Sequence, residues 1–287
     1  MFGVGALGMI GQPVRRSTGS LLLYPTYVQD YLDRVTTNDV AGGNAQGLER
    51  GVTDAFNVVL QDLVADTILG VSGGVIAQEA SLSKALPFMC GARTITGCLT
   101  PVVGPAPTNI NFTGVRYNRK TGLLGDGATT HLLSNYDNSA DPQNDKHIAV
   151  WQTEHFARNA TRAVIGTGGV TGSSVLVATT STRFFRVNHG GTSNDSNISD
   201  NTTVTGFWGA SRNSATSLTG RYNSTNYTFN IASAAPAAGN IFVFSRGTNS
   251  EITNGRLSSY SIGRHLNLSV LEARIAELMN TLAALSL

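Results

Sequence analysis

Hydrophobic residues in the first third of the chain recur with helical spacing. One run places apolar side chains at intervals of four, four, three and four residues, as on a single helix face. Its members are Leu48, Val52, Phe56, Val59 and Leu63. This run predicts a helix over residues 47–69, and weaker patterns predict short helices over 28–35 and 81–89. We therefore expect a small helical module at residues 29–90.

From residue 92 onward the pattern changes to short runs of strand-forming residues. Each run is bounded by clusters of Gly, Asn or Asp, which are turn residues. The predicted strands cover residues 94–100, 148–153, 162–165, 174–179, 183–188, 203–208, 227–231, 241–245 and 257–262. The segments between them are too short for the crossover helices that parallel strands need. An antiparallel β-sandwich is therefore expected.

The last twenty residues again follow a helical pattern. Apolar side chains alternate at intervals of four and three, at Leu271, Ile275, Leu278, Leu282 and Leu285. Ser269 and Glu272 match a capping box at its start, with Leu268 placed for a hydrophobic staple. Two heptads are too few to indicate a coiled coil. The helix over 267–287 is expected either to dock on the sandwich or to contact symmetry-related copies.

Residues 1–28 are interpreted as an N-terminal arm. The first ten are short, apolar and rich in glycine, which is too little to form a core alone. The positive charges of Arg15 and Arg16 follow the apolar run, whereas a secretory signal places them before it. The arm is expected either to be frayed or to dock on a partner.

Composition narrows the kinds of partner. Only 13% of the 287 residues are charged and the net charge is +2, which gives no reason to expect nucleic acid. No apolar run approaches the roughly 20 residues that span a membrane. Cys90 and Cys98 are too few for a disulfide framework, and their spacing is not that of a zinc site, so buried thiols or one local bridge are expected. Scarce charge favours neutral hydrogen bonds and aromatic faces as contacts.

Catalytic motifs appear without the context that they need. The segment Gly70-Val-Ser72-Gly-Gly74 matches a nucleophile elbow, but it follows a helix instead of a parallel strand. His147 and His155 would lie roughly 26 Å apart on one extended strand. Asp195 and Asp200 are compatible with a calcium loop or with ordinary solvated turns. We predict no catalytic residue, no metal site and no cofactor.

Four segments together resemble the concanavalin A-like (laminin G-like) jelly-roll domain found in virion proteins of tailed bacteriophages and related particles. The most characteristic parts are the Gly125-Asp-Gly127 turn and the closing strand followed by Ile262-Gly263 and a helix. The resemblance covers roughly residues 48–287 and leaves the arm unmatched. Its segments are residues 91–112, 117–127, 138–151 and 256–266.

The resemblance implies a jelly-roll sandwich at residues 91–266. It also implies a fibre or spike protein at the surface of a virion, usually a homotrimer, made in the bacterial cytoplasm. The arm would then dock on other virion proteins, and the jelly roll would bind host surface polysaccharide. A purely structural decoration protein of the capsid or tail is the main alternative, and a polysaccharide depolymerase is the third.

No ligand residue follows from the resemblance, so candidates come from the residues themselves. More than half of residues 188–230 are Ser, Thr or Asn, which suits either solvent-facing strands and loops or a hydrogen-bonding face for sugars. On the second interpretation, aromatic rings would stack on sugar rings, and amide, guanidinium and imidazole groups would bind hydroxyls. The candidates are Trp208, Tyr222 and Tyr227 for stacking, and Arg212, Asn213, Asn226 and His189 for hydrogen bonding.

Overall fold

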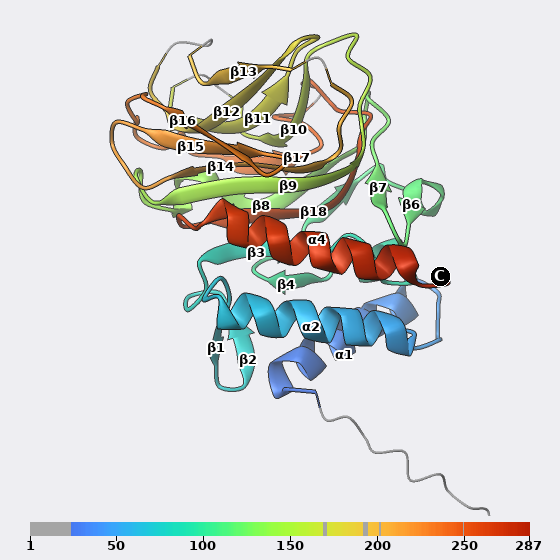
Figure 1. The fold of residues 1–287 in the computed structure, drawn as a ribbon. Helices are drawn as coiled ribbons and strands as arrows, with labels where there is room; N and C mark the ends of the chain where they lie inside the picture. Colours follow the sequence, from blue (N-terminus) through green and yellow to red (C-terminus); the bar gives the residue numbers. More distant parts are fainter. Residues whose placement is uncertain (1–23, 169–170, 192–194, 201, 249) are drawn as a thin grey trace, which may run out of the picture.

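The chain folds into two stacked antiparallel sheets with helices on the outer side of one of them. A computed structural model describes residues 24–168, 171–191, 195–200, 202–248 and 250–287. In Figure 1 the smaller sheet lies at the top, the larger sheet below it, and the helices at the bottom. The expected mainly-β class, an antiparallel jelly-roll sandwich with N-terminal helices and a C-terminal helix, is confirmed.

The smaller sheet has seven strands. In spatial order they are β13 (Asn197–Ser199), β12 (Thr182–His189), β11 (Ser173–Ala178), β10 (Arg162–Gly166), β17 (Asn240–Val243), β8 (His131–Asp137) and β5 (Thr108–Ile110). The 3-10 turn η2 (Asn138–Ala140) follows β8. Four of these strands, β10, β11, β12 and β17, overlap runs predicted from the sequence.

The larger sheet has nine strands. In spatial order its main path is β16 (Thr225–Phe229), β15 (Leu218–Tyr222), β14 (Gly206–Arg212), β9 (Lys146–Glu154), β18 (Arg256–Gly263), β3 (Ser83–Pro87) and β4 (Pro101–Val103). The hairpin of β6 (Tyr117–Asn118) and β7 (Gly122–Leu124) joins β18 at one end, after the 3-10 turn η1 (Gly114–Arg116). The strands β9 and β18 lie at the centre of this sheet.

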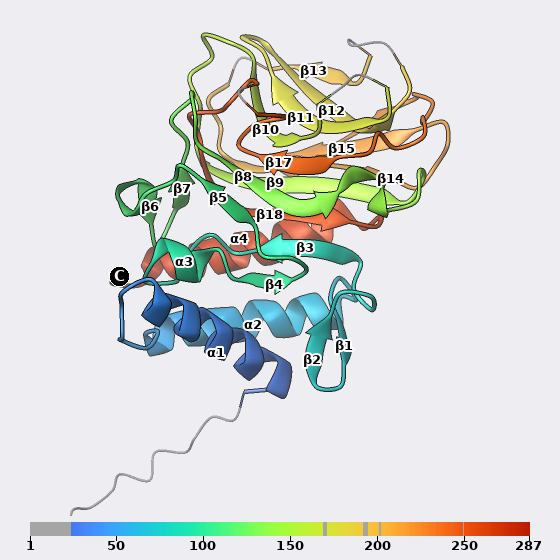
Figure 2. The same ribbon diagram turned by 180° about the vertical axis from the view of Figure 1, so that it is seen from behind.

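Three long helices form the layer outside the larger sheet. They are α1 (Thr26–Ala41), α2 (Arg50–Ala65) and α4 (Leu268–Ala284), and α4 lies between the sheet and α2 (Figure 1). Figure 2 shows α1 beside α2 from behind, next to the small hairpin of β1 (Gly70–Ser72) and β2 (Val75–Ala77). The predicted stripe of α2 is buried from Val52 to Leu63.

The stripe of α4 is also covered within the chain. Leu271, Ile275, Leu278 and Leu282 are buried, and the helix packs on α2 and β14. Of the two interpretations of this helix, docking on the body of the protein is therefore the one observed. A layer of helices on one sheet face means that the larger sheet is covered on both sides.

Two local predictions were wrong because tertiary contacts outweigh the local pattern. Residues 81–89 do not form a helix; they contain β3, which pairs with β18 and β4. Residues 94–100 do not form a strand; they contain the short helix α3 (Ile95–Cys98). The buried carboxylate of Asp39 accepts hydrogen bonds from the backbone nitrogens of Arg93 (2.9 Å) and Thr94 (2.7 Å) and so fixes the start of α3.

The helical layer and the sandwich are tied together by ion pairs. Glu49, which precedes α2, pairs with Arg119 of the β6–β7 turn and with Arg93. Hydrogen bonds from Arg119 lower the pKa of Glu49 to about 2. Since β3 of the expected helical module is also a strand of the larger sheet, residues 29–90 and 91–266 share one core.

The two cysteines and the residues of the expected arm have the following places in the structure. Cys90 and Cys98 are buried free thiols, and burial raises the pKa of Cys90 to about 12. Residues 1–23 of the expected arm lie outside the described residues, and its last residues, from Thr26, already belong to α1. Within the described part of the chain, no helix combines the length and the apolar character needed to cross a membrane.

Candidate functional site

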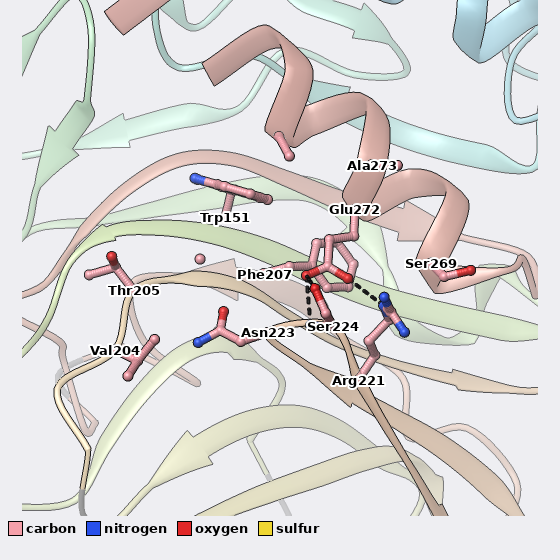
Figure 3. Close-up of a pocket in the computed structure, with 12 residues that line it drawn as sticks. Trp151, Val204, Thr205, Phe207, Arg221, Asn223, Ser224, Ser269, Glu272 and Ala273 are labelled. Atoms are coloured by element: carbon pink, nitrogen blue, oxygen red, sulfur yellow. Dashed lines mark hydrogen bonds and ion pairs between the residues drawn. The ribbon is translucent and has the colours of Figure 1, made fainter. Parts of the chain in front are cut away.

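A cleft with a volume of about 450 Å³ lies between the start of α4 and the outer face of the larger sheet. Trp151 of β9, Phe207 of β14 and Arg221 of β15 line its sheet side, and Ser269 and Glu272 of α4 line its helix side (Figure 3). The volume lies within the range of small-molecule sites. The cleft is therefore the candidate functional site.

Strand alternation decides which aromatic residue reaches the cleft. In the pairing of β14 with β9, Phe207 lies opposite Trp151 and Trp208 lies opposite Val150. Because successive side chains point to opposite faces of a sheet, Phe207 and Trp151 face the helices while Trp208 faces the sandwich core. Phe207 is fully buried beneath the cleft, whereas Trp151 is half-buried and offers part of its ring.

The turn between β15 and β16 supplies an amide on the side opposite Trp151. Asn223 and Ser224 form a two-residue hairpin with φ of 41° and 66°, as in a type I′ turn. The backbone at Gly206 makes room for Asn223, because a Cβ there would lie 2.3 Å from Asn223 Oδ1. The side-chain nitrogen of Asn223 has no hydrogen-bond partner among the described residues. In Figure 3 this side chain lies across the cleft from the indole of Trp151.

One ion pair closes the end of the cleft. Arg221 Nε donates to Glu272 Oε2 at 2.5 Å, and each side chain is only 10% exposed. Glu272 Oε1 accepts a hydrogen bond from the backbone nitrogen of Ser224 at 2.9 Å, and Arg221 Nη1 donates to Asn226 Oδ1 at 2.8 Å. Glu272 therefore links α4 to β15 and to the turn between β15 and β16.

The predicted capping box at the start of α4 was wrong, and this explains the position of Glu272. The N-cap residue is Asn267, whose side chain accepts a hydrogen bond from the backbone nitrogen of Ser269 at 3.1 Å. With the cap made by Asn267, the Glu272 carboxylate points away from the helix end toward Arg221. Glu272, which matched the capping-box pattern, thus belongs to the cleft instead of the helix cap.

No protein-family model matches the chain, and no curated protein matches it. Among solved structures, the chain is similar to the CBM40 module of the Ruminococcus gnavus IT-sialidase bound to α2,3-sialyllactose, with 14% identity and a TM-score of 0.36. That similarity covers 48% of this chain and 89% of the module.

Two further solved structures show the same level of similarity. Domain 4 of an extracellular arabinanase from Geobacillus stearothermophilus, in complex with arabinotriose, has 11% identity and a TM-score of 0.37, covering 51% of this chain and 72% of that one. The binding domain of botulinum neurotoxin serotype D has 11% identity and a TM-score of 0.44, covering 68% of this chain and 51% of that one. At these values the similarities carry no conclusion about a ligand of this chain.

Two of the predicted stacking residues, Trp208 and Tyr222, are in the sandwich core and not on a ligand-binding face. Both are less than 10% exposed, and Tyr222 Oη donates to the carbonyl of Val204. The guanidinium of Arg183 lies 4.8 Å from the centre of the Trp208 ring and 4.2 Å from that of Tyr222. The prediction failed because aromatic residues within a polar stretch of sequence were expected to be exposed.

Arg212 and His189 are buried as well, so neither presents a hydrogen-bonding group to a ligand. Arg212 donates to backbone carbonyls, including that of Val187 at 2.8 Å, and burial lowers its pKa to about 10. His189 is 1% exposed and lies 2.8 Å from Asp195, and burial lowers its pKa. Both side chains stabilise loop connections at the ends of strands.

The remaining three candidates are accessible but do not form one site. Asn213 is exposed at the far end of β14, 3.4 Å from the ring of His265. Tyr227 is half-buried, and its ring centre lies 6.1 Å from that of Phe185 in the other sheet. Only Asn226 borders the cleft, through its hydrogen bond with Arg221. Sequence reasoning missed Trp151, Asn223 and the Arg221–Glu272 pair.

The motif residues occupy structural positions. Ser72 ends β1 in a hairpin whose turn is Gly73 and Gly74, both with positive φ. His147 Nε2 lies 2.7 Å from Ser261 Oγ, but both residues are fully buried, so a substrate cannot reach this pair. Among the described residues, no three His, Cys, Asp or Glu side chains are grouped to hold a metal ion.

Proposed function

We propose that the protein binds carbohydrate and that the cleft between α4 and the larger sheet is its binding site. The observation that carries this proposal is a half-buried tryptophan ring across from a buried amide nitrogen that has no hydrogen-bond partner among the described residues. A sugar ring has an apolar C–H face that packs on an aromatic ring, and hydroxyl groups that pair with amide and hydroxyl side chains. Trp151 supplies the first kind of contact, and Asn223, Thr205 and Ser224 supply the second.

The proposed activity is binding without hydrolysis. A glycosidase uses two carboxyl groups on either side of the scissile bond. Glu272 is the one carboxylate among the described residues that line the cleft, and both of its oxygens already accept hydrogen bonds. This arrangement supports a lectin-like role over that of a depolymerase.

The biological setting that we propose is the surface of a phage-like particle. Its support is the sequence resemblance to concanavalin A-like virion proteins, together with an apolar arm that cannot fold alone. The arm would attach the protein to other virion proteins, and the cleft would bind polysaccharide on the bacterial host. Several linked copies, as in a trimer, would raise a weak single-site affinity through effective concentration.

Replacing Trp151 by alanine is expected to weaken oligosaccharide binding by at least about tenfold, because it removes the stacking surface. The measurement is binding of the full-length chain to an array of bacterial surface polysaccharides. Asn213→Ala is the control, because Asn213 directly follows β14, is exposed and does not line the cleft. Equal loss in both variants, or no loss in Trp151→Ala, would contradict the assignment of the cleft.

Deleting residues 2–20 is expected to abolish incorporation into particles while the rest of the chain folds normally. The measurement is the content of this protein in purified particles, with circular dichroism of the isolated variant as the folding control. Normal incorporation of the deletion variant would contradict the proposed attachment. A particle-associated chain that binds no polysaccharide would instead favour the decoration protein.

A further inference from the structure

We infer that the cleft selects neutral sugars over acidic ones and that the Arg221–Glu272 ion pair determines this preference. The inference rests on the proposed function, since it concerns the ligand of the same cleft. It identifies Glu272 as a specificity-determining residue and describes the chemical class of ligand that the cleft accepts.

Two charges of opposite sign line the cleft. Arg221 and Glu272 are the two charged side chains among its described lining residues, and they neutralise each other at 2.5 Å. The remaining polar lining groups are hydroxyls and an amide, on residues such as Thr205, Asn223 and Ser269. The cleft therefore presents no net charge to a ligand.

The guanidinium of Arg221 is the group in the cleft that would bind an acidic sugar. Arginine binds carboxylates through paired N–H donors, and this is the strongest neutral-pH contact available to a uronic or sialic acid. In this protein Nε of Arg221 is bound to Glu272, and Nη1 is bound to the side-chain oxygen of Asn226. The Nε edge of the guanidinium is therefore occupied, and a ligand carboxylate that used this edge would have to displace the Glu272 carboxylate.

Displacing the Glu272 carboxylate from that edge would be costly. Glu272 Oε1 also accepts a hydrogen bond from the backbone nitrogen of Ser224, so its carboxylate is held from two sides. Placing a second carboxylate beside it adds like-charge repulsion to the cost of desolvation. Binding of a neutral sugar involves neither the like-charge repulsion nor the desolvation of a carboxylate. Its hydroxyl groups match the neutral donors and acceptors in the rest of the cleft.

The experiment measures binding of the full-length chain to matched pairs of immobilised oligosaccharides. Each pair has equal length and differs only by replacing hexoses with hexuronic acids. The wild-type chain is expected to prefer the neutral member by about tenfold or more at physiological salt. This comparison needs no variant, so it remains decisive if a substituted chain fails to fold.

The substitution Glu272→Gln tests the residue itself. It keeps the shape of the side chain but leaves the Arg221 charge without a carboxylate, so binding of the acidic members should rise by about tenfold relative to wild type. Glu277→Gln is the matched control: it removes one negative charge from α4 at an exposed position that does not line the cleft. It should leave the preference unchanged.

The outcomes separate the inference from the proposed function. Preference of the wild-type chain for acidic oligosaccharides would overturn the inference while leaving carbohydrate binding intact. An equal shift in Glu272→Gln and Glu277→Gln would also overturn it, because general charge and not the ion pair would then set the preference. Binding to no oligosaccharide of either class would overturn the proposed function and the inference with it.

Discussion

Replacing Asp141 by alanine is expected to lower the free energy of unfolding by about 3–5 kcal/mol, because it leaves a buried ammonium group without its carboxylate. Lys146 Nζ lies 3.0 Å from Asp141 Oδ2, and Lys146 is fully buried. Tyr136 Oη donates to the other carboxylate oxygen at 2.9 Å. Burial already lowers the pKa of Lys146, and loss of the carboxylate would lower it further. The measurement is urea unfolding at neutral pH.

A double variant separates loss of a partner from loss of packing. In Asp141→Leu with Lys146→Met both charges are replaced by apolar groups, so most of the stability should return. If instead the double variant is as unstable as Asp141→Ala, packing and not the unpaired ammonium explains the loss. An Asp141→Ala chain as stable as wild type would show that Lys146 reaches solvent or another acceptor.

The elements of this fold could largely be predicted from periodicity, because both periods are visible in the sequence. The stripe from Val52 to Leu63 predicted α2, and the short β-rich runs predicted half of the strands in the two sheets. Predictions failed where a distant partner decides the structure. Asp39, more than fifty residues before α3, supplies the carboxylate that turns residues 95–98 into a helix.

The faces of the central strands could not be predicted for a different reason. In β9, every residue from Lys146 to Val150 is buried, because the sandwich core covers one face of the larger sheet and the helices cover the other. A strand covered on both sides loses the alternation that would identify its outer face. One signal was available: Phe207 and Trp208 are adjacent, so only one of them can face the core.

The cleft itself depends on segments that only the fold brings together. Trp151, the β15–β16 turn and the first turns of α4 are far apart in the sequence, and Arg221 and Glu272 are 51 residues apart. The local pattern at Ser269 and Glu272 favoured a capping box, which assigned the acidic residue to the helix end. Glu272 can be assigned to the cleft only when its contact with Arg221 is known and when Asn267 is known to make the cap of α4.

Replacing Asp200 by alanine is expected to lower the free energy of unfolding by a similar amount, about 3–5 kcal/mol, because Arg183 lies fully buried between two aromatic rings. Asp200 pairs with Arg183 and with Arg158, and its other oxygen accepts hydrogen bonds from Thr202. Removing it leaves the Arg183 guanidinium without a carboxylate inside the sandwich. Thermal and urea unfolding at neutral pH measure the loss.

The pH dependence of this effect identifies its origin. Burial alone would raise the pKa of Asp200, but hydrogen bonds from Thr202 and Arg183 outweigh burial and lower the pKa to about 2, below its ordinary 3.8. A lowered pKa in the folded state means that the carboxylate stabilises the fold above pH 3.8 and that this contribution disappears as the pH falls through 2. The stability difference between wild type and Asp200→Ala should therefore be constant near neutrality and shrink between pH 4 and pH 2.

The control is Arg183→Met combined with Asp200→Leu, which removes both charges and should recover much of the stability at every pH. A difference between wild type and Asp200→Ala that does not change with pH would mean that the carboxylate contributes through packing alone. Such a result would leave Arg183 stabilised by the rings of Trp208 and Tyr222, whose cation–π contacts do not titrate with Asp200. The acid limb of the stability curve thus distinguishes an ion pair from an aromatic cage as the element that holds Arg183 in the core.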